Sequence, residues 1–438
     1  MMASIATARE AQRNWEAQPL RRRLAVVRQL RVAIAAEATA LAQLAAAPND
    51  RPVAEKLVSE VIPLLDACRF LERRAAPILR PKKFGARGRP LWLRGSSFTV
   101  ERKPFGVVLI VGPRNYPLFL PGVQLLQALV AGNSVLLKPA ENCSGPLRWL
   151  VERMRLAPDL VQLLPEPPES AQQAVRAGVD KVVFTGSSEN GRSLLALMAE
   201  RNTPGVFELS GADSVFVRQD ADLERAAQAI TFGRRLNAGE TCMAPQSIFA
   251  HASVAEHLRE LLGNDIDVRS FASDEEAIEL ARRAEHGLGA SIFSANEKAA
   301  RSLASQLPTG FVTINDLIVP TADPRFPFGG VRASGFGSTR GAEGLLEMTY
   351  PHVIAVRRAR ALPHLEPVQP NDQEIFAAYI KTAYGSGMNR MKSLGALLRR
   401  VRKRGVEAGV SPARTQGSAI AKTAAKSSAA DTAAAAPR

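Results

Sequence analysis

The chain has 438 residues and a formal net charge of +15 at pH 7. That length exceeds what one hydrophobic core usually supports, so a single small domain is excluded and two or three domains are expected. With 46% hydrophobic and 23% charged residues, the composition is that of a globular protein. Residues 357–438 carry 15 Lys and Arg against 5 Asp and Glu, so most of the net positive charge lies there. The rest of the chain is nearly balanced, and no specific nucleic-acid partner is expected for it.

The three cysteines, Cys68, Cys143 and Cys242, are too few and odd in number for a disulfide framework. No Cys-x-x-Cys pair or Cys/His cluster has the spacing of zinc ligands, so no metal is expected. The first 15 residues lack the apolar core of a signal peptide, and no uncharged stretch is long enough to span a membrane. These features favour a protein of a reducing, cytoplasmic compartment.

The N-terminal part of the chain is predicted to be helical over residues 5–80. Apolar residues recur with helical spacing at 20–45 and again at 53–79. Residues 91–103 are predicted to form a short pair of strands, bridged by a turn at Gly95.

From residue 104 onward, short apolar runs alternate with helical stretches. Five such runs are residues 107–111, 134–137, 160–164, 181–184 and 206–209. This alternation predicts a parallel, doubly wound α/β sheet, whose ligands bind beyond the carboxyl ends of the strands. A second β/α region is expected over 210–318, followed by a Gly-rich loop at 326–337 and a last strand at 349–357.

Polar residues follow the first two of these runs. Asn115 comes after the first run, where its amide could donate to a developing oxyanion or simply satisfy a turn. Lys138 and Glu141 come after the second run. They could hold the two hydroxyls of a ribose, or form a solvated ion pair.

Candidate phosphate-binding and catalytic residues follow the later runs. Gly186 and Ser187 lie where a helix is expected to begin, and backbone N–H groups at a helix N-terminus suit a phosphate, although most such glycine pairs are turns. Glu208 ends the fifth run and could act as a general base. Cys242 offers a thiol beside a tight turn at Gly239, although a lone cysteine is more often a small buried hydrophobe.

Taken in order along one chain, these segments resemble the aldehyde dehydrogenase superfamily. The resemblance covers roughly residues 10–357, and the motif sequences are most similar to those of the branch that acts on fatty and aromatic aldehydes. The 34-residue step from Glu208 to Cys242 also fits the family. The matching segments are 104–118 (PFGVVLIVGPRNYPL), 131–141 (AGNSVLLKPAE), 184–192, 208–211, 237–245 (NAGETCMAP), 286–294, 310–315 and 327–337 (PFGGVRASGFG).

The resemblance implies a fold with three parts: a Rossmann-like cofactor-binding domain, an α/β catalytic domain and a small β oligomerisation element. A homodimer is the assembly it implies. The parts would comprise residues 1–90 with 104–209 for the cofactor, 210–345 for catalysis, and the strands 91–103 and 349–357 for oligomerisation.

The resemblance also implies oxidation of an aldehyde, lipid-derived or aromatic, to a carboxylic acid. Cys242 would attack the aldehyde carbon, Asn115 and the Cys242 N–H would hold the oxyanion, and Glu208 would activate water to hydrolyse the thioester. The cofactor would be NAD, with NADP as the alternative, because Glu141 would repel a 2′-phosphate. The residues that the resemblance assigns to the cofactor are Pro113, Lys138, Glu141, Gly186, Ser187, Gly191 and Leu209.

One departure from the family is a gap. Only 44 residues separate Cys242 from His286, so the catalytic domain is shortened between 245 and 275. The missing stretch normally ends in a Glu that binds the nicotinamide ribose. Glu260 stands at the corresponding distance, but residues 254–262 have helical spacing, and we favour the helix. Weaker cofactor anchoring would follow, so the alternative function is a catalytically weak relative that binds cofactor or aldehyde, or an assembly subunit.

Three substitutions also depart from the family pattern. Arg114 stands where the family usually has Trp, and could lower the pKa of the thiol or narrow the aldehyde tunnel. Ser210 and Glu240 replace a usual Gly and Gln. An inward-pointing carboxylate at 240 would raise the pKa of the Cys242 thiol.

The C-terminal segment 358–438 is predicted to be a basic tail, largely disordered beyond 405. Residues 375–401 could form a helix, and 390–404 hold seven basic residues and no acid in an amphipathic pattern. Such a helix could bind an anionic membrane surface at the inner face, which would suit lipid-derived aldehydes. The alternative is a solvated or nucleic-acid-binding extension.

Overall fold

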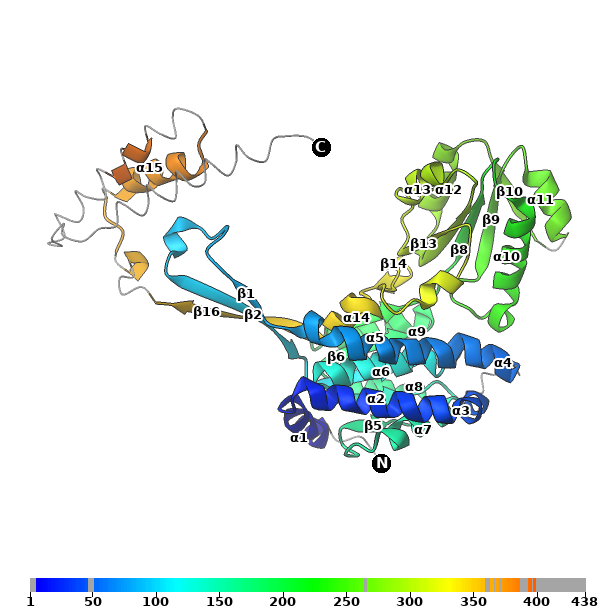
Figure 1. Ribbon diagram of the computed structural model, residues 1–438, viewed down its shortest axis with the longest axis horizontal. Helices are drawn as coiled ribbons and strands as arrows, with labels where there is room; N and C mark the ends of the chain where they lie inside the picture. Colours follow the sequence, from blue (N-terminus) through cyan, green and yellow to red (C-terminus); the bar gives the residue numbers. More distant parts are fainter. Residues whose placement is uncertain are drawn as a thin grey trace. The chain divides into compact units, whose positions relative to one another are not determined.

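The computed structural model describes residues 5–45, 51–263, 266–358, 363–365, 367–370, 372–386, 393–395 and 397–398. The chain divides into two compact units, one running to Trp92 and from Ser97 to Val356, the other formed by Leu93–Ser96 and the chain from Arg357 onward. The first unit contains both large sheets and all the motifs named above (Figure 1).

The first sheet has six strands in the order β15-β7-β6-β3-β4-β5. The strands are β3 (Val107–Val111), β4 (Ser134–Lys138), β5 (Val161–Leu163), β6 (Lys181–Thr185), β7 (Gly205–Glu208) and β15 (Gly335–Phe336). β3 to β7 run parallel, and β15 pairs antiparallel with β7. Every residue of β3, β4 and β6 is buried, which explains why these strands show no polar alternation in the sequence. The five strands predicted between 107 and 209 are confirmed.

The strand order changes direction at β3, because β4 lies on one side of it and β6 on the other. Ligands of doubly wound sheets bind at such a point, beyond the carboxyl ends of the strands. The loops after β3 and β6 therefore flank the expected ligand crevice.

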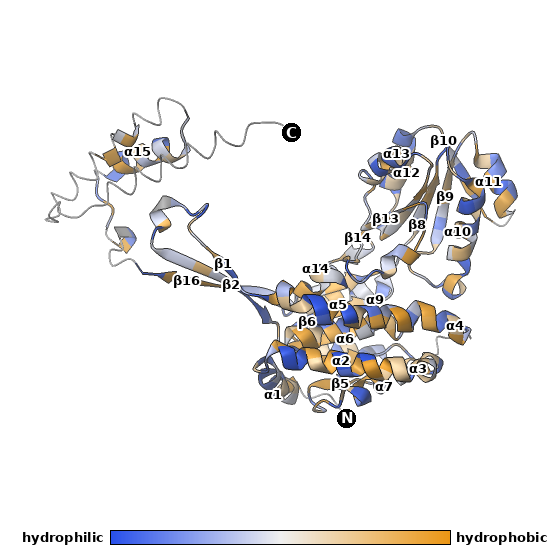
Figure 2. Cartoon of the chain, in the orientation of Figure 1, coloured by the Kyte–Doolittle hydropathy of each residue, from blue (hydrophilic) through white to orange (hydrophobic). Residues whose placement is uncertain are grey.

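One face of this sheet is covered by α6 (Phe119–Ala131), and all 13 residues of this helix are buried. It contacts β3 and β4 as well as the N-terminal helices α2 (Leu20–Ala36) and α5 (Ile62–Leu79). The outer helix α2 is amphipathic: Val26, Val27, Leu30 and Ile34 are buried and several of its arginines are exposed. The mixed colouring of this helix in Figure 2 shows the two kinds of residue.

The rest of the N-terminal segment is also helical, as predicted. Its elements are α1 (Ile5–Glu16), α3 (Ala38–Leu44), α4 (Val53–Lys56) and a π-helical turn, η1 (Leu57–Val61), which leads into α5. Pro63, near the start of α5, explains the π-helical turn, because proline cannot donate to the carbonyl of Ser59 and its ring would clash there. The wider turn directs Glu60 inward, where it is fully buried.

The second sheet has five parallel strands in the order β10-β9-β8-β12-β13. The strands are β8 (Asp213–Val217), β9 (Pro245–His251), β10 (Val268–Phe271), β12 (Gly289–Phe293) and β13 (Phe311–Ile314). Its helices are α10 (Leu223–Arg235), α11 (Ala255–Leu262), α12 (Asp274–Arg283) and α13 (Glu297–Ala304). This arrangement confirms the predicted β/α region at 210–318, and α11 connects β9 directly to β10.

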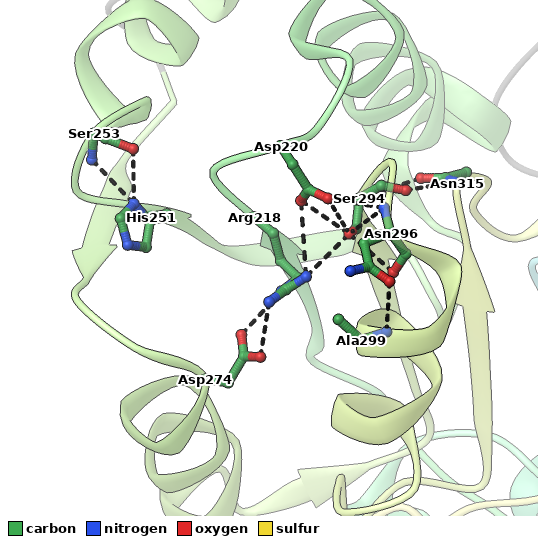
Figure 3. A network of polar contacts seen from close by, with 9 residues as sticks. All are labelled: Arg218, Asp220, His251, Ser253, Asp274, Ser294, Asn296, Ala299 and Asn315. Atoms are coloured by element: carbon green, nitrogen blue, oxygen red, sulfur yellow. Dashed lines mark hydrogen bonds and ion pairs between the residues drawn. The ribbon is translucent and has the colours of Figure 1, made fainter.

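A network of polar side chains joins the loops after the strands of this second sheet (Figure 3). Arg218, after β8, donates two hydrogen bonds of 2.9 Å to Asp274 at the start of α12. It also donates to Ser294 Oγ at 3.2 Å, and Ser294 Oγ donates to Asp220 at 2.9 Å. These side chains bond to one another and so fix the loops at this edge.

A third, smaller sheet contains β1 (Lys82–Phe84), β2 (Ser96–Pro104) and β16 (Thr349–Arg357). The prediction of two strands within residues 91–103 is wrong, because Leu91–Leu93 forms a 3-10 helix and β2 pairs with β1, earlier in the chain. Sequence patterning missed β1 because its three residues are all exposed and show no apolar alternation. The predicted last strand, β16, is confirmed.

The remaining elements of the first unit are the helices that connect β4 to β7, together with a further helix, two short strands and two turns. They are α7 (Ser144–Met154), α8 (Pro168–Ala177), α9 (Ser188–Ala199), α14 (Gly341–Glu347), the paired β11 (His286–Gly287) and β14 (Val331–Arg332), and the 3-10 turns η3 (Leu236–Gly239) and η4 (Val319–Ala322).

In the second unit, α15 (Asp372–Tyr384) follows a 3-10 turn, η5 (Pro363–Leu365). The prediction of one helix over 375–401 is wrong, because α15 ends at Tyr384 and the next residue, Gly385, disfavours helix. Most of the basic segment 390–404 and all of 405–438 lie outside the described residues. In the part of the chain that the structure describes, no helix is long and apolar enough to cross a membrane.

Candidate active site

The structure brings the loop after β3 against the loop that leads to Cys242. Asn115 Nδ2 donates a hydrogen bond of 2.8 Å to the carbonyl of Glu240. The next residue along, Tyr116, shares a hydrogen bond of 2.6 Å with the hydroxyl of Thr241. Two successive contacts therefore join Asn115 and Tyr116 to the residues immediately before Cys242.

The loop before Cys242 has a left-handed backbone. Asn237, Ala238 and Gly239 have φ values of 54°, 52° and 81°. An alanine in this region costs about 1 kcal/mol or more, so surrounding contacts must hold it. Asn237 supplies two of them: its N–H donates to Glu55 Oε1 at 3.0 Å, and its Nδ2 donates to the carbonyl of Asn115 at 2.9 Å.

Cys242 is only partly exposed, and its thiol lies in an acidic environment. Burial raises its pKa well above the usual range, and the neighbouring carboxyls of Glu208 and Asp213 raise it further, while Arg340 lowers it. At neutral pH the thiol is therefore protonated, and a nucleophilic role requires a base to remove the proton.

Glu208, at the end of β7, is only 2% exposed. Burial raises the pKa of its carboxyl, and the charge of Arg340 and a hydrogen bond from Thr339 oppose that rise. Thr339 Oγ1 donates to Glu208 Oε2 at 3.3 Å, whereas Oε1 is buried without a protein partner. The carboxylate thus keeps one oxygen available to accept a proton.

Arg340, which the sequence analysis did not single out, is a buried cation beside both groups. Its guanidinium lies over the rings of Phe328 and Phe119, 4.1 and 5.5 Å from their centroids, and donates to the Thr321 carbonyl at 2.6 Å. The signal available in the sequence was its position three residues after the end of the Gly-rich loop, but side-chain direction cannot be read from that spacing.

Asp213, at the start of β8, is a second buried carboxyl that the sequence analysis did not single out. Its Oδ1 accepts a hydrogen bond of 3.0 Å from Gly289 N–H, and burial raises its pKa to about 7. A Cβ at Gly289 would meet the Asp213 side chain, and one at Gly211 would meet the Cys242 carbonyl. Glycine at both positions therefore lets this carboxyl lie close to the cysteine.

The expected effects of Arg114 and Glu240 on the thiol take a different form in the structure. The two side chains pair with each other at 3.2 Å, and Arg114 is largely exposed. The carboxyls that raise the pKa of the thiol are those of Glu208 and Asp213, and the cation that lowers it is Arg340. Ser210 uses its carbonyl to accept a hydrogen bond of 2.9 Å from Ser334 Oγ.

The predicted cofactor residues lie along the carboxyl edge of the first sheet. Pro113 follows β3, and Gly186 and Ser187 follow β6 on the other side of the direction change. Ser187 caps α9 by accepting from the N–H of Asn190 at 3.4 Å. Ser188 Oγ is buried here without a protein partner, which suits a phosphate oxygen at the start of a twelve-residue helix.

Lys138 and Glu141 flank the same edge at the end of β4. Lys138 is buried, which lowers its pKa, and Glu166 is the carboxylate that most opposes this change. Glu141 is exposed. Glu166, which the sequence analysis did not consider, accepts from the N–H groups of Asn142 and Ser144 and so shapes the loop that carries Glu141.

Gly191 and Leu209 have a packing role in the structure. A Cβ at Gly191 would meet the Leu209 side chain and approach the Phe184 ring. A glycine at 191 is thus explained by the packing of α9 on the sheet, and a cofactor contact of either residue stays a prediction. The predicted helix at 254–262 is confirmed as α11, and Glu260 lies on its exposed side.

A groove of about 620 Å³ opens beside the cysteine loop. Its walls come from α4, η1, α10 and α11, and Leu236, the first residue of η3, is one of its lining residues. Three of its lining residues, Glu55, Glu224 and Arg235, are charged. The others are apolar or uncharged: Val58, Ala227, Gln228, Thr231, Phe232, Leu236 and Leu261. Within the described ranges, no group of three His, Cys, Asp or Glu side chains could hold a metal ion.

Comparison with known proteins identifies the family. The model of the aldehyde dehydrogenase family matches residues 1–269 and 260–354, two segments that meet within the shortened region. A 4,4′-diapolycopene aldehyde oxidase of a Methylomonas species is 30% identical over an alignment of 410 residues, gaps included. The alignment covers 76% of this chain and 77% of that protein. Since 76% of 438 residues is fewer than 410, tens of positions in that relative have no counterpart here.

Other relatives and solved structures agree. A 4,4′-diaponeurosporen-aldehyde dehydrogenase of Staphylococcus aureus is 26% identical, over 64% of this chain and 78% of that protein. The fold matches substrate-bound Staphylococcus aureus AldH with a TM-score of 0.77 at 21% identity, covering 85% and 98% of the two chains. It matches Mycobacterium tuberculosis aldehyde dehydrogenase complexed with NAD+ with a TM-score of 0.74 at 22% identity, covering 82% and 90%. The chain belongs to the aldehyde dehydrogenase family and is an NAD(P)-dependent aldehyde dehydrogenase.

Proposed function

We propose that Cys242 is the nucleophile, Asn115 the oxyanion donor and Glu208 the general base of this enzyme. The observation that carries the proposal is the hydrogen bond from Asn115 Nδ2 to Glu240, which holds the amide beside the cysteine loop. The NH₂ group has a second N–H that can donate to a substrate oxygen. Together with the N–H of Cys242, it would stabilise the oxyanion.

The reaction begins with transfer of the thiol proton to the Glu208 carboxylate, because the thiol of Cys242 has a raised pKa. A carbon–sulfur bond then forms at the aldehyde carbon. The carbon–hydrogen bond breaks, with its electron pair, to leave a thioester on Cys242. The oxidised nicotinamide supplies the hydride acceptor for this step. Glu208 then releases its first proton to solvent. It takes a second proton from water, whose oxygen attacks the thioester. The carbon–sulfur bond breaks, a carboxylic acid leaves, and the Cys242 thiolate takes this second proton back from Glu208.

The cofactor is expected to be NAD in preference to NADP. The buried, unpartnered Ser188 Oγ and the N-terminus of α9 support binding of the pyrophosphate, together with Gly186 and Ser187. Lys138 and Glu141 would hold the adenine ribose, and the Glu141 carboxylate would repel a 2′-phosphate. Pro113 lies on the opposite side of the same crevice.

The aldehyde is expected to be elongated and apolar. The groove beside η3 is large and lined mainly by carbon, and its lining residue Leu236 directly precedes the left-handed turn before Cys242. Two relatives are named for 4,4′-diapolycopene aldehyde and 4,4′-diaponeurosporen-aldehyde. The preferred aldehyde should therefore be lipid-like.

The test is NADH formation with purified protein and a series of short, long-chain and aromatic aldehydes, beside Cys242→Ala. Turnover that vanishes in the variant supports the thioester route, and a kcat/KM that rises with chain length supports the apolar substrate. Turnover retained by Cys242→Ala would sink the assignment of the nucleophile. With NADP in place of NAD, kcat/KM should be lower.

A second candidate is a catalytically weak cofactor- or aldehyde-binding protein. The specific observation in its favour is α11, which occupies the place where the family's nicotinamide-ribose Glu would be sought and leaves Glu260 exposed. NAD binding by calorimetry without turnover of any aldehyde would select this function.

Two further proposals concern assembly and location. The strand β16 is exposed along most of its length and includes Tyr350, Val353, Ile354 and Val356, which suits pairing between subunits of a homodimer. Light scattering would report its mass. Binding of the basic segment 390–404 to an anionic membrane is tested by co-sedimentation with anionic liposomes, and binding that persists after removal of 360–438 would sink that idea.

A further inference from the structure

We propose that Arg51 is a positioning residue that, through Glu55 and Glu60, fixes Asn115 and the loop before Cys242 against each other. The inference rests on the proposed function in one respect, that Asn115 and Cys242 meet the aldehyde. Arg51 itself is buried beneath both loops and acts through them.

The guanidinium of Arg51 has an exposed side-chain fraction of 2% and contacts two carboxylates. Its Nη2 donates to Glu60 Oε1 at 2.7 Å, and Nη1 lies 3.8 Å from Glu55 Oε1. Nη2 also donates to the carbonyl of Asn115 at 3.3 Å, and the group lies over the ring of Tyr116 at 5.5 Å. One cation therefore contacts the Asn115 loop and both carboxylates.

Each carboxylate also accepts hydrogen bonds from a different catalytic loop. Glu60 Oε2 accepts from the N–H groups of Leu118 and Phe119 at 2.8 and 3.3 Å, where the chain leaves Asn115 and enters α6. Glu55 Oε1 accepts from the N–H of Asn237 at 3.0 Å, in the left-handed turn before Cys242.

The two loops also meet directly above Arg51. Asn237 Nδ2 donates to the carbonyl of Asn115 at 2.9 Å, the same oxygen that accepts from Arg51. Two donors thus hold this peptide group. The orientation of the peptide sets where the Asn115 amide points.

The π-helical turn η1 makes this arrangement possible. Glu55 and Glu60 are five residues apart, and a regular α-helix would place them about 140° apart around its axis. The wider turn over Leu57–Val61 changes that angle, so that both carboxylates reach one guanidinium while Val58 stays exposed in the groove. Such turns within helices are frequent at functional sites.

Loss of the guanidinium would disturb both loops. Burial already raises the pKa of Glu60, and without Arg51 its carboxyl would be favoured in the neutral form, which is a weaker acceptor for the N–H groups of Leu118 and Phe119. The carbonyl of Asn115 would keep one of its two donors. A displacement of about 1 Å in a catalytic group costs a rate factor on the order of 100.

The experiment compares Arg51→Gln and Arg51→Lys with Arg218→Gln. Arg218 is a matched control because it also pairs with a carboxylate on another element, Asp274, at the far edge of the second sheet (Figure 3). We expect Arg51→Gln to lower kcat at least about 10-fold with KM within about 3-fold, because transition-state positioning is lost and binding is not. Arg51→Lys, which keeps the charge without the fork, should recover part of kcat. Arg218→Gln should stay within about 2-fold of the wild type.

A double-mutant cycle shows whether Arg51 acts through Asn115. In an Asn115→Ala background, Arg51→Gln should cost much less than in the wild type, because the group being positioned is absent. Equal costs in the two backgrounds, or a loss of kcat no larger than that of Arg218→Gln, would overturn the proposal.

A second readout does not depend on turnover. If the wild type shows no Cys242-dependent oxidation, the proposed function fails, and alkylation of Cys242 by iodoacetamide, followed by mass spectrometry, still tests the positioning. The looser loop should make the partly exposed thiol more accessible, so Arg51→Gln should react several-fold faster than Arg218→Gln at one pH. Equal alkylation rates would contradict the inference.

Discussion

The hydroxyl of Thr339 donates a hydrogen bond to the carboxylate of Glu208 across 3.3 Å, while the other oxygen of that carboxylate has no protein partner. The bond favours the ionised form and opposes the rise that burial causes in the pKa of Glu208. The carboxylate is thus held by one oxygen, and the other is free to act in the proposed role of proton acceptor.

Replacing Thr339 with valine should therefore shift the pH profile of kcat. The pKa of Glu208 would rise further, and because only the ionised carboxylate acts as a base, activity on the acidic side should be lost at a higher pH than in the wild type. Thr339→Ser keeps the hydroxyl and should restore the acidic side of the wild-type pH profile. A profile unchanged in Thr339→Val would show that this bond does not tune the base.

Glu208→Gln should slow both halves of the reaction. Without a base for the thiol or for water, formation of the thioester and its hydrolysis should each slow, so steady-state NADH formation should fall by a factor on the order of 10² to 10⁴, with no initial burst at the wild-type rate. Glu240→Gln is the control, because that side chain pairs with Arg114 outside the site and only its carbonyl contacts Asn115. Equal steady-state rates in Glu208→Gln and wild type would contradict the role of Glu208.

Asp213→Asn should change both the stability of the folded protein and the pKa of the Cys242 thiol. The pKa of Asp213 is raised from 3.8 to about 7, so the folded state binds a proton that the unfolded state has lost between these values, and stability should fall as the pH rises from about 4 to 7. That difference corresponds to roughly 4 kcal/mol at most. The variant should be less sensitive to pH over this range in urea unfolding, and more stable than the wild type at pH 8.

The same substitution removes a carboxyl that raises the pKa of Cys242. Alkylation of the thiol at pH 8 should therefore be faster in Asp213→Asn than in the wild type. Slower alkylation would show that the carboxyl helps to ionise the thiol instead.

Phe232→Ala should lower kcat/KM for long-chain aldehydes about 10-fold and leave short aldehydes nearly unchanged, since a removed apolar wall is worth about 1–3 kcal/mol. Phe232 lies in the groove and is 46% exposed, so its loss should cost little stability. The control variant is Val32→Ala, because Val32 is an exposed apolar residue of α2 that does not line the groove. A uniform loss with every aldehyde would argue against the groove as the substrate path.

Much of the fold could be read from the sequence because its strands are buried on both faces. β3, β4 and β6 appear as compact apolar runs with polar residues directly after them, which is why Asn115, Lys138 and Gly186 could be placed at a strand edge. β1 could not be found, since three exposed residues carry no periodic signal.

The environment of the candidate catalytic groups was beyond the sequence for a different reason. Arg340 and Thr339 lie 131 residues or more beyond Glu208, and Arg51 lies 64 residues before Asn115. None of these three residues lies in a segment whose residue spacing indicates a function. Their importance comes from burial beside a charge, which depends on the tertiary fold, whereas Cys242, Glu208 and Asn115 were marked by family motifs.

The complete burial of α6 has a consequence for hydrogen exchange. A helix with no solvent-facing side cannot fray independently, so its amides should exchange only when the whole cofactor-binding sheet opens. Asn115 lies at the edge of this most protected region, whereas α11, with only two buried residues, should open locally and exchange early. On heating, the loop that carries Asn115 should therefore persist until global unfolding, and the outer edge of the second sheet should loosen first.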